Sequence, residues 1–287
     1  MGLRSLYDVA APAKLNLFLH VVGRRADGYH LLQSVFVLID WCDTLHFERR
    51  ADGRLARHDL GAALPDDDLC LRAARLLQAE SGTRLGADIS IDKHVPWGAG
   101  MGGGSSDAAS TLLALNRLWG LNLPRERLAA LGLKLGADVP FFIGGHNAFV
   151  EGIGERLTPL PVPRAWFAVV KPPAAIATSA IFGSPLLVRN TEAVILAGFL
   201  ADTAGGFGRN DLQAPAEARC AEVGVAREIL QRRFGNARMT GSGSAVFARA
   251  GTGAEPTAAM PADLPPGWVG RMCRSLEQHP LVGWAPD

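Results

Sequence analysis

Five of the seven residues from Gly98 to Gly104 are glycine, within the stretch VPWGAGMGGGSSDAAS (95–110). Glycine in an ordered segment costs conformational entropy, so a run this dense indicates that side chains would block a close approach. The residue pattern predicts a strand before it, over 87–97, and a helix after it, over 105–120. Such a turn points free amide groups and the positive end of the helix dipole at one spot. The stretch therefore predicts an anion site with phosphate as the leading ligand, and a purely structural turn is the alternative.

Three well-known nucleotide sites fit the glycine stretch poorly. A Walker loop needs a lysine after its last glycine, where this chain has Ser105. Gly98, Gly100 and Gly103 match G-x-G-x-x-G. A dinucleotide fold also needs an acidic residue about 20 positions later at the end of a strand, and the candidate, Glu126, lies in a helical pattern. Protein kinases carry H-R-D and D-F-G elements, which this sequence lacks.

Charge and cysteine content limit the class of protein. The 287 residues carry a formal net charge of +1, so no overall field favours nucleic acid or an anionic membrane. No apolar run reaches the ~18 residues of a membrane span, and the N-terminus has no signal-peptide pattern. The four cysteines lie far apart, as reduced thiols do in cytoplasmic proteins. We expect a cytoplasmic protein with no nucleic acid, no membrane and at most a weak homodimer among its partners.

Strand and helix patterns follow one another irregularly along the chain. Residues 12–22 and 34–49 are typical of half-buried strands, and 64–82 of a helix with aspartates in its first turn. Residues 237–250 indicate a strand–turn–strand unit. A Pro-rich passage, LTPLPVPRA (157–165), is predicted to separate two domains. Without regular βαβ alternation, the pattern favours an α+β fold over a doubly wound sheet.

Three motifs, in order, resemble those of one enzyme family. The glycine stretch is similar to the phosphate-binding motif of the GHMP small-molecule kinases, although Met101 stands where leucine is usual. PAKLNLFL (12–19) resembles the N-terminal motif of that family and MTGSGSAVFA (239–248) its C-terminal glycine-rich motif. The likeness runs from about residue 10 to about residue 250. It implies two domains: a nucleotide-binding N-terminal domain (1–157), similar to a domain of ribosomal protein S5, and an α/β-sandwich C-terminal domain (164–287).

The resemblance also implies ATP and Mg²⁺ as the cofactors of phosphoryl transfer. The implied ATP-binding residues are Pro96, Trp97, Gly98, Ala99, Gly100, Met101, Gly102, Gly103, Gly104, Ser105 and Ser106. Ser105, Ser106 or Asp107 is expected to cap the helix, and a β-branched side chain at Gly103 to fill the space of the anion. Ser105 or Ser106 could ligate the metal, but no carboxylate pair identifies the metal site, and its ligands stay unknown.

Two charged residues are implied to be catalytic. Asp138 of GADVPFF would take the proton of the acceptor alcohol, and Lys14 of PAKLN would orient Asp138 and offset charge on the reacting oxygen. Taken alone, Asp138 is also typical of a turn before Pro140, and Lys14 could extend from its strand to water. Spacing along the chain does not decide whether the two side chains meet.

The acceptor site is implied by a longer likeness. Residues 12–36 and 136–142 resemble a branch of the family whose acceptor alcohol carries a cytidine diphosphate. The implied substrate-binding residues are Asn16, Tyr29, His30, Thr178, Phe182, Gly241 and Gly243. Tyr29 and Phe182 would stack on the cytosine, and His30 would hydrogen-bond its edge. Without the resemblance, Tyr29 and His30 are an ordinary half-buried pair, Phe182 is a core residue, and the two glycines form a hairpin turn.

The leading expectation is an ATP-dependent kinase that phosphorylates an alcohol carrying a cytidine diphosphate. Its expected partner is therefore a small-molecule substrate. One rival is a kinase of the same family that acts on homoserine or mevalonate; ADGYH (26–30) and Phe182 argue against it. The other rival is a nucleotide- or RNA-binding module without catalysis. Near-neutral charge, Lys14 and Asp138 argue against that module.

Overall fold

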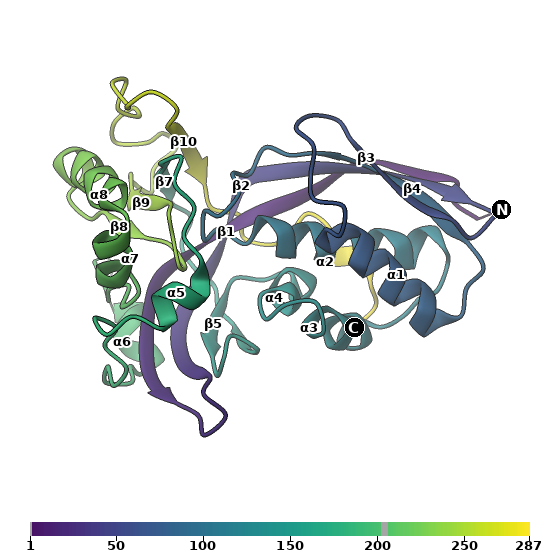
Figure 1. Cartoon of the computed structure of the whole chain (residues 1–287), viewed down its shortest axis with the longest axis horizontal. Helices are drawn as coiled ribbons and strands as arrows, with labels where there is room; N and C mark the ends of the chain where they lie inside the picture. The colour runs from purple at the N-terminus through teal and green to yellow at the C-terminus, as the bar shows by residue number, and fades with distance from the viewer. Residues whose placement is uncertain (1, 202–205) are drawn as a thin grey trace.

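Two β-sheets with helices on their outer faces build the molecule (Figure 1). A computed structural model describes residues 2–201 and 206–287. The first sheet and its helices come from the N-terminal half of the chain, and the second sheet and its helices from the C-terminal half. Strands and helices mix without regular βαβ alternation, which confirms the predicted α+β class.

The first sheet has six strands in the order β3-β4-β2-β5-β6, with β1 also paired to β2. The strands are β1 (Ser5–Arg24), β2 (His30–Arg50), β3 (Leu55–Asp59), β4 (Gly86–Asp92), β5 (Ala148–Glu151) and β6 (Arg156–Pro159). β3 and β4 pair in parallel, and the other pairs are antiparallel. The helices that cover this sheet are α1 (Leu69–Ser81), α2 (Gly103–Leu118), α3 (Arg125–Leu133) and α4 (Val139–Gly144).

The second sheet has four antiparallel strands in the order β10-β7-β9-β8. They are β7 (Trp166–Lys171), β8 (Arg238–Met239), β9 (Val246–Arg249) and β10 (Val269–Arg274). The remaining helices are α5 (Thr178–Phe182), α6 (Leu196–Ala201), α7 (Gln213–Arg219), α8 (Ala221–Phe234) and the 3₁₀ turn η1 (Val282–Trp284). Helices α7 and α8 pack on the outer face of this sheet. The predicted strand–turn–strand unit over 237–250 is confirmed as β8, a glycine turn and β9.

Strands β1 and β2 are buried on both faces where the two sheets meet. Phe36 and Leu38 of β2 pack toward the helices of the first sheet, whereas Val35 and Val37 pack against the second sheet. The prediction of half-buried strands is wrong here, because the second sheet covers the face that a lone domain would leave to solvent. The junction between the sheets is therefore a continuous apolar core.

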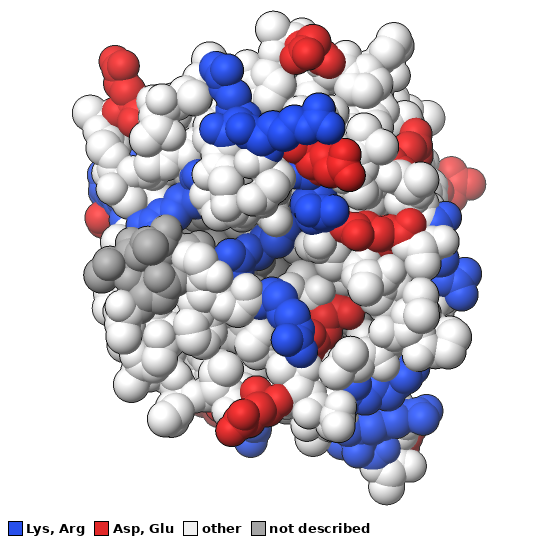
Figure 2. Space-filling view, turned by 90° about the vertical axis from the view of Figure 1, so that its left-hand side faces the viewer, with Lys and Arg blue, Asp and Glu red and all other residues white. Residues whose placement is uncertain are grey.

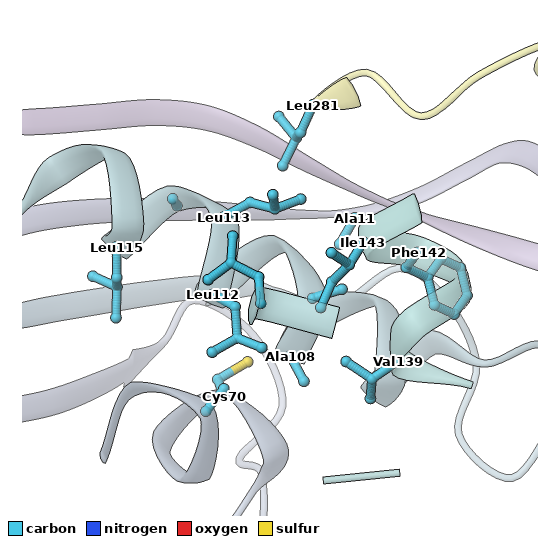
Figure 3. Packing of buried hydrophobic residues seen from close by; sticks show 14 of the residues in the cluster. Ala11, Cys70, Ala108, Leu112, Leu113, Leu115, Val139, Phe142, Ile143 and Leu281 are labelled. Carbon is cyan, nitrogen blue, oxygen red and sulfur yellow. The ribbon is translucent and has the colours of Figure 1, made fainter. Parts of the chain in front are cut away.

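The core between the first sheet and its helices fixes the elements that carry the site. Figure 3 shows side chains from several elements converging there: Ala11, Cys70, Ala108, Leu112, Leu113, Leu115, Val139, Phe142, Ile143 and Leu281. Leu281 follows β10, so the end of the chain returns to the first sheet's helices. Residues 160–165 link β6 to β7. The predicted domain limits, 1–157 and 164–287, stay a prediction.

The start of α1 corrects one expectation. The helix begins at Leu69, so Asp66, Asp67 and Asp68 precede its first turn instead of lying in it. Asp68 is the N-cap, and its carboxylate accepts a hydrogen bond from the Leu71 amide at 3.0 Å. The three carboxylates therefore lie just before the N-terminus of α1, and the one at Asp68 caps it.

Candidate active site

A cavity of about 1250 Å³ lies where the two sheets and their glycine turns meet. The predicted site residues that line it are Lys14, Asn16, Tyr29, His30, residues 96–105, Asp138, Thr178, Phe182, Gly241 and Gly243. Ser106 is the exception, because it is fully buried within α2 and does not line the cavity. Residues far apart in the sequence thus line one cavity, although their binding roles stay predictions.

The N-terminus of α2 opens on this cavity. The helix begins at Gly103, and its N-cap, Gly102, has a left-handed conformation with φ of 72°. In the described part of the chain no side chain caps α2, so the predicted cap by Ser105, Ser106 or Asp107 is wrong; all three residues lie inside the helix, which begins at Gly103. The first amide groups of the helix stay free to bind an anion, and 16 residues of aligned peptide dipoles favour one.

Gly100 and Gly241 bring the two glycine turns into contact. A Cβ atom at Gly100 would lie 2.3 Å from the carbonyl oxygen of Thr240, and one at Gly241 would lie 2.6 Å from that of Gly100. Both glycines have positive φ, 71° and 53°. The backbone of the turn between β8 and β9 therefore lies directly against Gly100, and this contact alone leaves no room for a side chain there. Two hydrogen bonds continue the contact: Ser244 N to Gly98 O at 3.0 Å and Ala245 N to Ala99 O at 3.2 Å.

Gly103 has a different neighbourhood from the one expected. Its Cβ would lie 3.1 Å from Cγ1 of Val95 and 3.5 Å from Nζ of Lys93. A Cβ at this position would press on Val95, and Gly103 also lines the cavity, so the expectation that a β-branched side chain fills the anion's space stays a prediction. Valine at this position would act first through crowding of Val95.

Lys14 and Asp138 meet at the cavity wall. Nζ of Lys14 lies 3.5 Å from Oδ2 of Asp138, with 4% of the Lys14 side chain exposed and 31% of the Asp138 side chain. The ammonium group also donates to Oδ1 of Asn16 at 2.6 Å and lies 4.3 Å from the centre of the Phe36 ring. Lys14 is thus buried among partners and does not extend to water. Asp138 is the N-cap residue of α4, but within the described residues its side chain makes no capping hydrogen bond, and it lines the cavity.

Asn16 and Thr178 are each tied to the second glycine turn. The backbone N–H of Asn16 donates to Oγ1 of Thr240 at 2.9 Å, and Nδ2 of the Asn16 side chain donates to Oγ of Ser34 at 3.0 Å. Thr178 begins α5, and its hydroxyl lies 2.9 Å from that of Ser242. Both polar side chains therefore have fixed positions at the cavity.

A buried ion triad holds the base of the glycine stretch, and the sequence reasoning missed it. Nζ of Lys93 donates to Asp43 and, at 2.6 Å, to Oδ2 of Asp107. The other oxygen of Asp43 accepts the amides of His94 and Val95 at 2.6 and 2.8 Å. Burial alone would lower the pKa of Lys93, but the two carboxylates outweigh it and raise that pKa. The triad ties β2, the end of β4 and α2 together.

His30 and Phe182 stack on one another at another part of the cavity wall. Their ring centres lie 4.9 Å apart, with 26° between the planes. Nε of Arg189, which the sequence reasoning also missed, donates to Nε2 of His30 at 3.1 Å. Tyr29 stands in the β1–β2 hairpin and is 60% exposed. The cytosine site with Tyr29 and Phe182 on either side stays a prediction, and His30 already covers one face of Phe182.

The outer surface carries mixed charge. Figure 2 shows the face at the left of Figure 1, with Lys and Arg across its middle and Asp and Glu among and around them. In residues 2–201 and 206–287 no helix is long and apolar enough to cross a membrane. The same ranges hold no cluster of three or more His, Cys, Asp or Glu that could bind a metal ion. The cytoplasmic location, the absence of nucleic-acid partners and the weak homodimer stay predictions.

Comparison with known proteins decides the family. The family models of the GHMP kinases match in two parts, the N terminal domain over residues 68–146 and the C terminal over residues 196–260. A 4-diphosphocytidyl-2-C-methyl-D-erythritol kinase from Methylibium petroleiphilum is 72% identical over 287 residues, which cover 99% of this chain and 100% of that protein. The chain belongs to the GHMP kinase family. A relative of the same name from Albidiferax ferrireducens is 58% identical to this GHMP kinase, over 99% of this chain and 96% of the relative.

Solved structures agree with this assignment. The crystal structure of a 4-(cytidine 5′-diphospho)-2C-methyl-D-erythritol kinase matches with a TM-score of 0.73 and 37% identity, over 84% of this chain and 89% of that chain. A homoserine kinase from Cytophaga hutchinsonii matches with a TM-score of 0.67 over 96% of both chains, at 14% identity. The second likeness shows the shared fold alone. The predicted two-domain GHMP kinase architecture is confirmed.

Proposed function

We propose that this GHMP kinase transfers the γ-phosphate of ATP to the 2-hydroxyl of 4-diphosphocytidyl-2-C-methyl-D-erythritol, a step of the non-mevalonate route to isoprenoid precursors. The observation that carries the proposal is the 72% identity with a kinase of that name over 99% of the chain. The cavity supports it, because the free amides of α2 suit phosphates and the Lys14–Asp138 pair lies next to them. The Lys14 amide donates to the Met101 carbonyl in the glycine stretch at 2.9 Å.

In this proposal each group has one task along the cavity. The glycine stretch and the first turn of α2 bind the ATP phosphates through backbone amides. Asp138 takes the proton of the acceptor hydroxyl as its oxygen attacks the γ-phosphorus, and the bond from that phosphorus to the bridging oxygen of ADP breaks. Lys14, 3.5 Å from this carboxylate, offsets the negative charge on the reacting oxygen. Asn16 positions Lys14 through their hydrogen bond.

Mg²⁺ is proposed to accompany ATP. Ser105 lines the cavity with a hydroxyl oxygen of the kind that Mg²⁺ accepts, whereas the hydroxyl of Ser106 is buried away from it. Proteins commonly supply this ion with one or two carboxylates and leave the other positions to phosphates and water. The residues present therefore fit an ion that is held mainly by the nucleotide. When bound, the ion neutralises charge between the terminal phosphates.

Turnover of ATP with several acceptors tests the proposed function. The purified protein receives ATP with 4-diphosphocytidyl-2-C-methyl-D-erythritol, with 2-C-methylerythritol, with homoserine or with mevalonate, and ADP release is measured. We expect turnover with the cytidine compound and little with the others. Equal turnover of 2-C-methylerythritol would contradict the cytidine site. ATP binding without turnover of any acceptor would instead favour the non-catalytic module.

Phe182→Ala is expected to weaken binding of the acceptor by about 5- to 150-fold through lost stacking. The substitution removes the ring that lies 4.9 Å from His30 and leaves the glycine stretch untouched. Calorimetric Kd values for the acceptor and for ATP check this prediction, and the affinity for ATP should scarcely change. Some loss of kcat is also expected, because binding energy remote from the reacting hydroxyl helps to position it.

The matched control keeps an aromatic ring. Tyr29→Phe removes only the hydroxyl from the exposed ring in the hairpin and is expected to bind the acceptor within about twofold of the wild type. If Phe182→Ala binds the acceptor as tightly as Tyr29→Phe does, Phe182 is a packing residue and the stacking role is wrong.

A further inference from the structure

One side chain decides which nitrogen of His30 carries the proton. Nε of Arg189 lies 3.1 Å from Nε2 of His30. A guanidinium group has donors only, so Nε2 must be the unprotonated acceptor, and the single proton of a neutral imidazole is then on Nδ1. In the described ranges of the chain the His30 ring makes no further hydrogen bond. Nδ1–H is therefore left for a ligand in the cavity that His30 lines.

Arg189 is itself held in place. Its two terminal nitrogens donate to the carbonyl oxygens of Leu187 at 3.0 Å and of Phe182 and Ser184 at 2.9 Å each. A planar guanidinium with several fixed bonds cannot rotate away from the imidazole without breaking them. Arg189 therefore binds both the imidazole of His30 and the backbone of Phe182, the residue whose ring stacks on that imidazole.

A fixed tautomer requires a neutral imidazole, and the surroundings of His30 favour the neutral form. Burial lowers its pKa, and the positive charges of Arg189 and Arg24 lower it further. The ring therefore stays uncharged near neutral pH, where a fixed tautomer presents one donor in one direction. Phe182 lies on one side of the imidazole plane, so a flat base bonded to Nδ1 in that plane can also contact Phe182.

We infer that Arg189 is a positioning residue for base preference: it holds His30 as the Nδ1–H tautomer, so that the cavity presents a donor to N3 of cytosine. The inference rests on the proposed function, which supplies a cytidine acceptor. N3 of cytosine has a lone pair, whereas N3 of uracil carries a proton, so uracil would set two donors against each other. A buried donor left unpaired in this way costs binding, which makes the fixed tautomer a filter against uridine compounds.

Three substitutions separate the tautomer from charge and from packing. In the wild type, kcat/KM for the cytidine acceptor should exceed that for its uridine analogue by about 5- to 150-fold. Arg189→Gln offers an amide that donates or accepts, so both tautomers of His30 form and the ratio should fall to within about twofold of one. Arg189→Lys keeps a donor-only cation and should keep the ratio, although its kcat/KM falls because the bonds to the three carbonyls are lost. Arg24→Gln removes the other nearby cation and should keep the ratio.

His30→Asn serves as a second test with Arg189 intact. Its amide can turn either its oxygen or its nitrogen toward the base, so the preference for cytosine should also be lost. ¹⁵N spectra of the free wild-type protein should show His30 protonated on Nδ1, and spectra of Arg189→Gln should show a mixture of tautomers. This readout needs no turnover, and a purely structural role of Arg189 would not change it.

Several outcomes would overturn the inference. They are a wild-type His30 protonated on Nε2, a base preference that survives in Arg189→Gln, and equal losses for both acceptors in Arg189→Gln and Arg189→Lys. A wild type that turns over the cytidine acceptor without preferring it to the uridine analogue would also overturn the inference and leave the proposed function intact. A wild type that does not turn over the cytidine acceptor at all would instead contradict the proposed function.

Discussion

Asp138→Asn is expected to lower kcat by ~10²–10⁴-fold while ATP and the acceptor still bind. The amide has nearly the shape of the carboxylate but cannot take the proton of the attacking hydroxyl. The fold should survive, because in the described structure the Asp138 side chain makes no capping hydrogen bond to α4 and is 31% exposed beside Lys14. Steady-state kinetics together with calorimetric Kd values for both substrates measure the effect.

Two further variants show whether the effect belongs to the pair. Lys14→Ala should lower kcat in the same direction, because the charge that offsets the reacting oxygen is removed from a buried position 3.5 Å from Asp138. Asp52→Asn changes a carboxylate that pairs with Arg50 in the loop between β2 and β3. Asp52 is not among the residues that line the cavity, so this variant should change kcat little. A rise in KM with kcat unchanged in Asp138→Asn or Lys14→Ala would make that residue a binding contact and contradict the proposed role.

Local pattern was enough for the elements around the phosphate site. The pattern over 87–97 predicted a strand, of which β4 forms the first part and ends at Asp92. The helical period after Gly104 predicted α2, and the glycines before it predicted free amide groups at the helix start. The meeting of Lys14 and Asp138 came from the family resemblance alone, because no periodicity relates residues in different elements. That contact is present at 3.5 Å, and the roles built on it await the kinetics.

The misses share a physical cause, which is the packing of one part of the chain on another. The sequence pattern of β1 and β2 predicted one buried face. It contains no information about the second sheet, which covers the other face. Lys93 lies at the end of a strand and Asp107 at the start of a helix, where single charges are common, so nothing local indicated that both join Asp43. Arg189 lies in a segment with no regular secondary structure, so no periodic pattern indicated the direction of its side chain.

Gly100→Ala is expected to lower the free energy of unfolding by ~2–5 kcal/mol, from ~1–2 kcal/mol for a side chain at positive φ and ~1–3 kcal/mol for overpacking. The new Cβ would lie 2.3 Å from the carbonyl oxygen of Thr240, at a backbone φ of 71°. The obstacle is backbone of the second glycine turn, which cannot rotate aside as the tip of a side chain can. Urea unfolding of the variant and the wild type measures the loss.

Gly104→Ala is the matched control, because it adds the same methyl group a few residues away. Its Cβ would lie 3.4 Å from Cδ1 of Leu69, an ordinary contact, and alanine is favoured over glycine in a helix by ~1 kcal/mol. This variant should be as stable as the wild type or slightly more stable. If Gly100→Ala unfolds like Gly104→Ala but loses affinity for ATP, the glycine at position 100 is there for the phosphates. If Gly100→Ala loses stability even without nucleotide, the bare backbone is there so that the two glycine turns can touch, and the phosphate site depends on that contact.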